Sequence, residues 1–108
     1  MRLHHVFEWD GDKAARNLKK HGVSFDDAAR VLSDDDGDFY HVDEHDAGHD
    51  VDEDRYVTTA SHPDDRRIVL RIVWTERSDG EKRVTRIISA RPASRREKKT
   101  YAQEIGDR

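Results

Sequence analysis

The pattern of apolar and polar residues at the start of the chain predicts a short strand followed by a helix. Residues 3–9 (LHHVFEW) form a short, largely apolar stretch that is typical of a strand. Asp10 or Asp12 is suited to cap a helix through residues 13–20 (KAARNLKK), because a carboxylate accepts hydrogen bonds from the first backbone N–H groups. Gly22 comes just after this stretch and is expected to end the helix.

A second helix is expected immediately afterwards, and then a long polar segment. Ser24 begins the stretch SFDDAARVL, and Asp27 three residues later gives it a start that is similar to a capping box. Residues 33–54 contain only five apolar side chains, which are too few to bury a helix or a strand well. We therefore expect mostly loop in this segment, with a short strand near Phe39.

The pattern changes to β-rich stretches beyond residue 54, with the turn signals HPDD and SDG between them. The stretches indicate an antiparallel meander and are RYVTTA (55–60), RIVLRIVWTE (67–76) and KRVTRIISA (82–90). The middle stretch is apolar from Ile68 to Trp74 except for Arg71, as expected of a central strand. Ser94 and Glu97 then form a second capping box, which starts a basic helix.

These elements together indicate an α+β fold. The sheet is expected to be an antiparallel meander of three to four strands, with two N-terminal helices and one C-terminal helix. A length of 108 residues predicts one domain over residues 1–108. No stretch approaches the ~20 apolar residues of a membrane span, and the N-terminus lacks the apolar segment of a signal peptide. We therefore expect a cytoplasmic protein.

The net charge of −4 conceals an uneven distribution of charged residues. Residues 26–54 carry thirteen acidic side chains and one basic side chain, whereas residues 66–108 carry thirteen basic and six acidic ones. The C-terminal part therefore has the charge to attract a polyanion such as a nucleic acid. The alternative is a solvated surface whose opposite charges lie in different segments.

Three histidines lie close together in HVDEHDAGH, residues 41–49, and the first five letters match the zinc-peptidase pattern H-x-x-E-H. Catalytic zinc needs both histidines on one face of a stable helix, together with a third ligand in a dry pocket. Here a glycine and several acidic residues surround the histidines, and no apolar helix face is present. We expect no metal and no other cofactor, and the lack of cysteine also excludes thiolate–zinc sites.

An ordered set of motifs runs through most of the chain. FEWDGDKAARNLKKHGVSFDDAARVL (residues 7–32) is followed by DEDRY, WTERSDG, RIISAR and ASRREKKTY. Over about residues 6–101 this set resembles the BrnT family of ribonuclease toxins from type II toxin–antitoxin systems. The resemblance implies a compact fold related to RelE-type toxins, with helices packed on an antiparallel sheet. It also implies an RNA substrate and a cognate antitoxin of BrnA type, a small DNA-binding protein with a ribbon-helix-helix fold.

RNA cleavage without a metal ion makes three chemical demands. The 2′-hydroxyl must lose its proton, the charge that grows on the phosphate must be stabilised, and the leaving 5′-oxygen must gain a proton. Guanidinium groups suit the second demand, so Arg77 and Arg91 are the candidate catalytic arginines. Glu76 and Tyr101 are the candidate proton-transfer groups. For Tyr101, packing at the edge of the core is the alternative role.

Further cations are candidates for binding the RNA backbone. Arg86 is expected on a strand, and Arg95 and Arg96 are expected at the start of the last helix. Lys20 and His21 end the first helix, where a histidine has the alternative role of a plain C-terminal cap. A basic surface that only pairs with the protein's own acidic groups is the alternative for the arginines.

The sequence therefore predicts an endoribonuclease toxin that works without a metal ion and is neutralised by its antitoxin. It is expected to meet operator DNA only through that antitoxin and not to bind membranes. One alternative is a catalytically inactive nucleic-acid-binding regulator on the same scaffold. The other is a metal-dependent hydrolase that uses His41 and His45, and adventitious metal binding by these residues and His49 also stays open.

Overall fold

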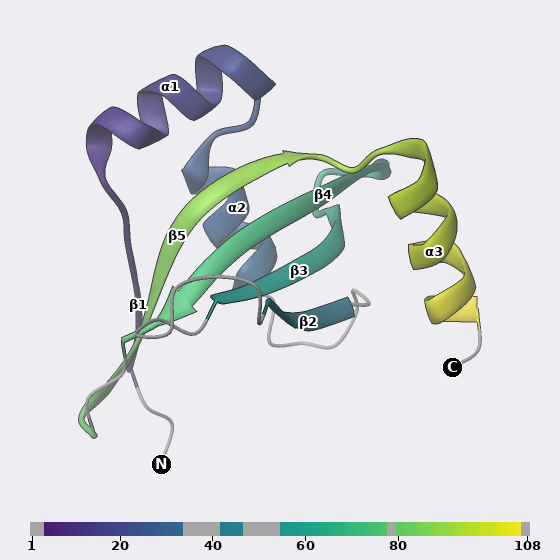
Figure 1. The fold of residues 1–108 in the computed structure, drawn as a ribbon. Helices are drawn as coiled ribbons and strands as arrows, with labels where there is room; N and C mark the ends of the chain where they lie inside the picture. The colour runs from purple at the N-terminus through teal and green to yellow at the C-terminus, as the bar shows by residue number, and fades with distance from the viewer. Residues whose placement is uncertain (1–3, 34–41, 47–54, 78–79, 107–108) are drawn as a thin grey trace.

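A computed structural model describes residues 4–33, 42–46, 55–77 and 80–106. The helices and strands follow one another in the order β1 (His4–Glu8), α1 (Gly11–His21), α2 (Phe25–Leu32), β2 (Val42–Asp46), β3 (Arg55–His62), β4 (Asp65–Glu76), β5 (Lys82–Pro92) and α3 (Arg95–Gly106). The α+β fold with two N-terminal helices and one C-terminal helix is confirmed (Figure 1).

The strands form one mixed sheet with the order β1-β5-β4-β3-β2. β3, β4 and β5 pair antiparallel, as the predicted meander requires, and β4 lies at the centre. β1 runs parallel to β5, with His4 opposite Lys82 and Glu8 opposite Arg86. Within the part of the chain that the structure describes, the sheet therefore has five strands, and β1 extends the expected antiparallel meander with a parallel strand.

Residues 42–46 form a strand, β2, where the sequence predicted mostly loop with a strand near Phe39. β2 pairs antiparallel with β3, from Val42 opposite Thr59 to Asp46 opposite Arg55. An edge strand is held by backbone hydrogen bonds to a single neighbour, so it needs few apolar side chains. The expectation of loop across this stretch was wrong for this reason, whereas Phe39 lies outside the described residues.

Helices α1 and α2 cover one face of the sheet, whereas α3 lies apart from them, directly after the end of β5 (Figure 1). Phe25, Ala28 and Val31 from α2 are at most 2% exposed and pack on the sheet. The main strand residues of this core are Ala60, Leu70, Ile72, Trp74, Ile87 and Ala90. A smaller cluster of Val69, Ala93, Tyr101 and Ile105 holds α3 against the sheet.

The helix caps form as the sequence predicts. Asp10 caps α1 by accepting hydrogen bonds from the backbone N–H groups of Asp12 and Lys13. Gly22 ends that helix with a φ of 72°, a left-handed conformation that favours glycine, and its N–H donates to the carbonyl of Leu18. Each cap satisfies backbone groups that a helix end leaves without internal partners.

The side chain of Asn17 joins α1 to the edge of β5. It is 8% exposed, and its amide nitrogen donates to the carbonyl oxygens of Val23 at 3.0 Å and Ala90 at 2.7 Å. Its Oδ1 accepts the N–H of Ala90 at 3.2 Å. Since β1 pairs only as far as Arg86, Asn17 satisfies the backbone of β5 beyond β1 in the way that a neighbouring strand would.

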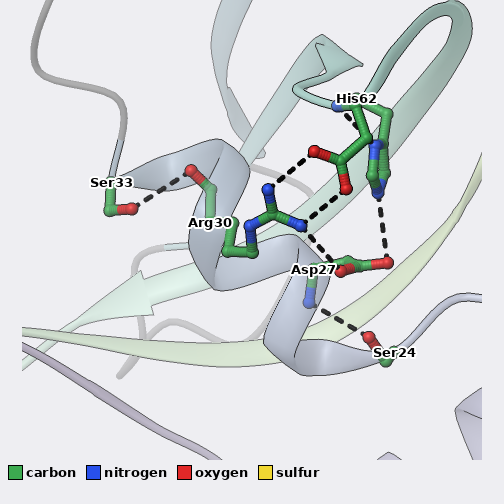
Figure 2. A network of polar contacts seen from close by, with 6 residues as sticks. Ser24, Asp27, Arg30, Ser33 and His62 are labelled. Atoms are coloured by element: carbon green, nitrogen blue, oxygen red, sulfur yellow. Dashed lines mark hydrogen bonds and ion pairs between the residues drawn. The ribbon is translucent and has the colours of Figure 1, made fainter.

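A polar network docks α2 onto the turn between β3 and β4 (Figure 2). Arg30 donates to both carboxylate oxygens of Asp64, at 2.9 Å and 2.8 Å. His62 Nδ1 accepts the backbone N–H of Asp64 at 3.0 Å, so its Nε2 carries the proton and donates to Asp27 at 3.1 Å. These contacts fix α2 relative to the strands that bear the candidate site.

Candidate functional site

The sheet turns alternate side chains away from α1 and α2, and arginines occupy several of these positions. Leu70 and Ile72 belong to the helix-covered core, so Arg71 between them lies on the opposite face. Arg55, Arg86 and Arg91 lie on that opposite face for the same reason. Each is the neighbour of a core residue, namely Tyr56, Ile87 and Ala90. We call this surface the arginine face, and its strand arginines are Arg55, Arg71, Arg86 and Arg91.

The strand register arranges these arginines in two rows across the sheet. One row runs from Arg55 through Thr75 to Arg86, and the other joins Arg71 to Arg91. Arg86 and Arg91 are five positions apart on β5, which is roughly 15 Å at ~3.3 Å per residue. The rows are therefore too far apart to hold the same phosphate group.

At one end of the arginine face, Arg77 and Arg86 approach the same carboxylate oxygen. Arg77 Nε lies 3.9 Å and Arg86 Nη1 lies 3.5 Å from Glu8 Oε1. The side chains of Arg77, Arg86 and Glu8 are 58%, 31% and 41% exposed, so solvent reaches all three. Both distances exceed that of a normal hydrogen bond, and each guanidinium group therefore keeps donors for another anion.

At the other end, Arg91 is held tightly by Glu97 of α3. Its two terminal nitrogens donate to the two carboxylate oxygens at 2.8 Å and 2.9 Å, and Arg71 Nε lies 3.3 Å from the same carboxylate. The hydrogen bonds from Arg91, aided by the backbone N–H of Ser94, lower the pKa of Glu97 from 4.5 to about 2. The carboxylate in turn raises the pKa of Arg91. A forked guanidinium pair of this kind suits two oxygens of a carboxylate or a phosphate.

The two predicted proton-transfer residues lie in different places. Glu76 ends β4, and its Oε1 lies 3.4 Å from Arg83 Nε, away from the contact between Arg77 and Glu8. Tyr101 is 5% exposed, packs with Val69 and Ala93, and places its hydroxyl 3.4 Å from Ser61 Oγ. The structure brings neither residue next to the other, nor Arg77 next to Arg91.

The predicted RNA-binding residues are divided between the arginine face and two other places, the start of α3 and the end of α1. Arg95 and Arg96 are exposed in the first turn of α3, close along the chain to Arg91. Lys20 and His21 line an open groove of about 350 Å³ between α1 and β5. Arg86 is the one of the five that belongs to the arginine face.

The comparison with protein-family models identifies the chain. Residues 9–97 match the model described as "Ribonuclease toxin, BrnT, of type II toxin-antitoxin system". The chain belongs to the BrnT family. The comparison with curated proteins found no match. The family resemblance inferred from the motifs is confirmed, and the chain is a ribonuclease toxin by family with an antitoxin partner.

Three residues of this candidate site were not among the candidates from sequence. Glu8 reaches Arg77 and Arg86, whereas Arg71 and Glu97 complete the cluster around Arg91. Arg71 had one visible signal, because it is the single charged residue in the otherwise apolar run from Ile68 to Trp74. Glu97 was recognised only as part of a capping box.

The H-x-x-E-H stretch of this BrnT chain does not lie on a helix where it is described. Val42–Asp46 is the strand β2, and His41 and His49 lie outside the described residues. Over residues 5–33, 55–77 and 80–106, whose side chains the structure describes, no three side chains of the metal-binding types gather around one point. In the same ranges, no helix has the length and apolar character needed to cross a membrane.

Proposed function

We propose that this BrnT toxin is a metal-independent endoribonuclease whose chemistry takes place on the arginine face. The observation that carries the proposal is the approach of Arg77 and Arg86 to one oxygen of Glu8, which unites two guanidinium groups with a carboxylate. Guanidinium groups bind phosphate oxygens and stay charged at any working pH. The proposed site is therefore able to bind RNA and to stabilise a transition state.

In the proposed mechanism, Arg77 and Arg86 donate to the non-bridging oxygens of the phosphate at the cut. Their charge stabilises the five-coordinate phosphorus, which forms when the 2′-oxygen attacks. Glu8 accepts the proton of the 2′-hydroxyl, since its carboxylate already lies between the two arginines. The bond to the 5′-oxygen then breaks, and this oxygen takes a proton from the solvent that reaches the exposed site. Glu8 returns its proton to solvent, and a 2′,3′-cyclic phosphate and a 5′-hydroxyl remain.

Arg91 and Arg71 supply a second site for backbone phosphate in this proposal. Their distance from Arg86, roughly 15 Å along β5, suits a phosphate further along the RNA. To bind that phosphate, Arg91 and Arg71 would either break their ion pairs with Glu97 or contact Glu97 and the phosphate at the same time. The exposed Arg95 and Arg96 add positive charge beside it. Tyr101 is proposed to anchor α3 through its buried ring, and Glu76 to pair with Arg83 away from the reacting phosphate.

Purified toxin is expected to cleave single-stranded RNA equally well with and without EDTA. The chemistry uses the RNA's own 2′-hydroxyl, so a 2′-deoxy substitution at the cut should abolish cleavage and still allow binding. The products should carry 2′,3′-cyclic phosphate ends, which mass spectrometry distinguishes from 3′-hydroxyl ends. Loss of activity in EDTA that returns with added zinc would favour the metal-dependent hydrolase. Binding of RNA without any cleavage would favour a nucleic-acid-binding regulator.

We also propose that a BrnA-like ribbon-helix-helix antitoxin neutralises the toxin in the cytoplasm, with residues 1–108 acting as one domain. The toxin would then contact operator DNA only through that protein. The basic stretch of residues 66–108 is a suitable surface for an acidic antitoxin segment, and a stable complex should bury at least ~1,000 Å².

Co-expression with the antitoxin encoded beside the toxin is expected to relieve growth arrest. The two proteins should co-purify at a salt concentration that screens simple charge attraction, because a packed interface also contributes. Colony counts with and without the antitoxin measure the rescue. A pair that associates only at low salt and leaves the cells arrested would contradict this part of the proposal.

A further inference from the structure

The groove between α1 and β5 lies outside the arginine face and has a basic wall. Its volume is about 350 Å³, and Lys13, Arg16 and Lys20 come from one side of α1. Positions separated by three and four residues lie on the same helix face, so the three cations form a continuous row. Across the groove, Ile88 and Ser89 of β5 form the opposite wall.

The charges of this row are available to a ligand. No ion pair joins Lys13, Arg16 or Lys20 to any residue that the structure describes. The pKa of Asp10 is lowered mainly by the backbone N–H groups of Lys13 and Asp12, and to a smaller extent by the charges of Lys13 and Arg16. Asp10 is already engaged as the helix cap, so the row keeps a net positive charge.

The two walls of the groove are also fixed relative to each other. This favours binding, because a ligand loses little affinity to the entropy cost of ordering the site. Asn17 lines it, but its amide is committed to Val23 and Ala90 and therefore fixes α1 against β5. The ring of His21 and the side chain of Ile88 give the groove an apolar surface beside the cations. A phosphate with an attached sugar and base has this combination of charge and apolar area.

The groove borders β5, the strand that carries the proposed catalytic Arg86, on the side of the sheet that α1 covers. Ile88 and Ser89 follow Arg86 by two and three positions on β5, which corresponds to roughly 7–10 Å. Arg86 itself points to the opposite face, so an RNA strand bound there would reach the groove within a few nucleotides by crossing the edge of β5 beyond Arg86, where β1 no longer pairs with it. This short distance along β5 favours RNA over an acidic protein segment as the ligand.

We propose that this groove is a subsite for the phosphate backbone of single-stranded RNA next to the cut. The inference rests on the proposed function, and it adds a contact that lengthens the bound RNA beyond the reacting nucleotides. Lys13, Arg16 and Lys20 would hold the phosphate, with Ser89 and His21 beside the sugar and base. Such a subsite contributes to substrate affinity and leaves the chemical step unchanged.

The test compares two double variants with the same loss of charge. Arg16→Gln/Lys20→Gln removes two cations from the groove, whereas Lys19→Gln/Arg67→Gln removes two exposed cations outside it. The probe is a fully 2′-deoxy ten-nucleotide single strand, which binds and cannot be cut. The groove variant should bind roughly 25-fold more weakly at ~0.1 M salt, with a salt slope shallower by about 1.4, at about 0.7 per lost phosphate contact.

Cleavage assays separate this inference from the proposed function. With a long RNA the groove variant should show a raised KM and a kcat within about threefold, and with a dinucleotide it should equal the control. A groove variant that binds the ten-nucleotide strand as well as the control does would overturn the subsite, even if RNA is cleaved. A groove variant that binds the antitoxin more weakly and binds RNA normally would also overturn the subsite, because the groove would then be a protein-binding site. Weaker binding by a toxin that never cleaves RNA would support the groove and refute the nuclease.

Discussion

Alanine at Arg77 or at Arg86 is expected to lower kcat for RNA cleavage by on the order of 100-fold, with a change in KM below about threefold. Loss of one preorganised donor to a developing negative charge typically costs that much, or about 2.7 kcal/mol. Both guanidinium groups approach Glu8, so each is placed to act on the same phosphate. Single-turnover cleavage of a short RNA measures the effect directly on the chemical step.

Matched variants identify the geometry behind that loss. Arg77→Lys should recover little activity, because an ammonium group cannot reproduce the two-pronged contact of a guanidinium. Arg67→Ala removes an exposed arginine near the start of β4 and should leave kcat unchanged. Arg91→Ala should chiefly raise KM, because Arg91 lies roughly 15 Å from Arg86 along β5. Tyr101→Phe keeps the buried ring and should keep kcat.

The opposite ranking would refute the proposed location of the cut. A 100-fold loss of kcat in Arg91→Ala, together with near-normal activity in Arg77→Ala and Arg86→Ala, would place the chemistry beside α3. Full activity in all three variants would leave RNA binding without catalysis as the explanation for the arginine face. Circular dichroism on each variant shows whether a loss of rate reflects chemistry or unfolding.

The elements of the fold that the sequence predicted well are those set by local chemistry. Asp10 and Ser24 cap α1 and α2 by accepting hydrogen bonds from backbone N–H groups within three residues. The sequence signal for each cap therefore lies within a few residues of the helix start. Gly22 ends α1 for a similarly local reason. The meander was predictable because its three strands follow one another directly, with short turns between them.

The site was only partly predictable because it depends on pairings between distant segments. Glu8 reaches Arg86 through the parallel pairing of β1 with β5, whose residues are far apart in the sequence. Nothing near Glu8 in the sequence indicates that pairing. Arg77 and Arg91 were expected to act together because they lie at the ends of two adjacent strands, or on them, but the structure places them in separate groups around Glu8 and Glu97. Alternation identifies the face of a strand, whereas register decides which side chains meet.

Glu97 is expected to be the acidic side chain on which folding stability depends most. Its carboxylate accepts two hydrogen bonds from Arg91, lies 3.3 Å from Arg71 Nε, and is 22% exposed. Its pKa falls from 4.5 to about 2 on folding, and the hydrogen bonds from Arg91 are the main cause. At 1.36 kcal/mol per pKa unit the shift corresponds to roughly 3 kcal/mol at neutral pH, and partial exposure to solvent reduces it to about 2 kcal/mol.

Glu97→Gln separates the charge of this residue from its role as a helix cap. Glu97 and Ser94 form a capping box, in which each backbone N–H donates to the other side chain, and glutamine can replace glutamate there. The variant therefore loses the ion pairs with Arg91 and Arg71 and keeps the start of α3. Urea unfolding at pH 7 should show a loss of about 2 kcal/mol in the free energy of unfolding.

The pH dependence of that difference is the decisive measurement. A carboxylate whose pKa is depressed by folding stabilises the protein above its unfolded pKa, here about 4.5, and loses this contribution as pH falls through its folded pKa of about 2. The gap between wild type and Glu97→Gln should therefore be constant above about pH 6 and shrink towards zero between about pH 5 and pH 2. Glu104→Gln, on the exposed side of the same helix, should differ little from wild type at any pH. A gap for Glu97→Gln that keeps its full size down to pH 2 would show that packing, and not the ion pair with Arg91 and Arg71, holds α3 on the sheet.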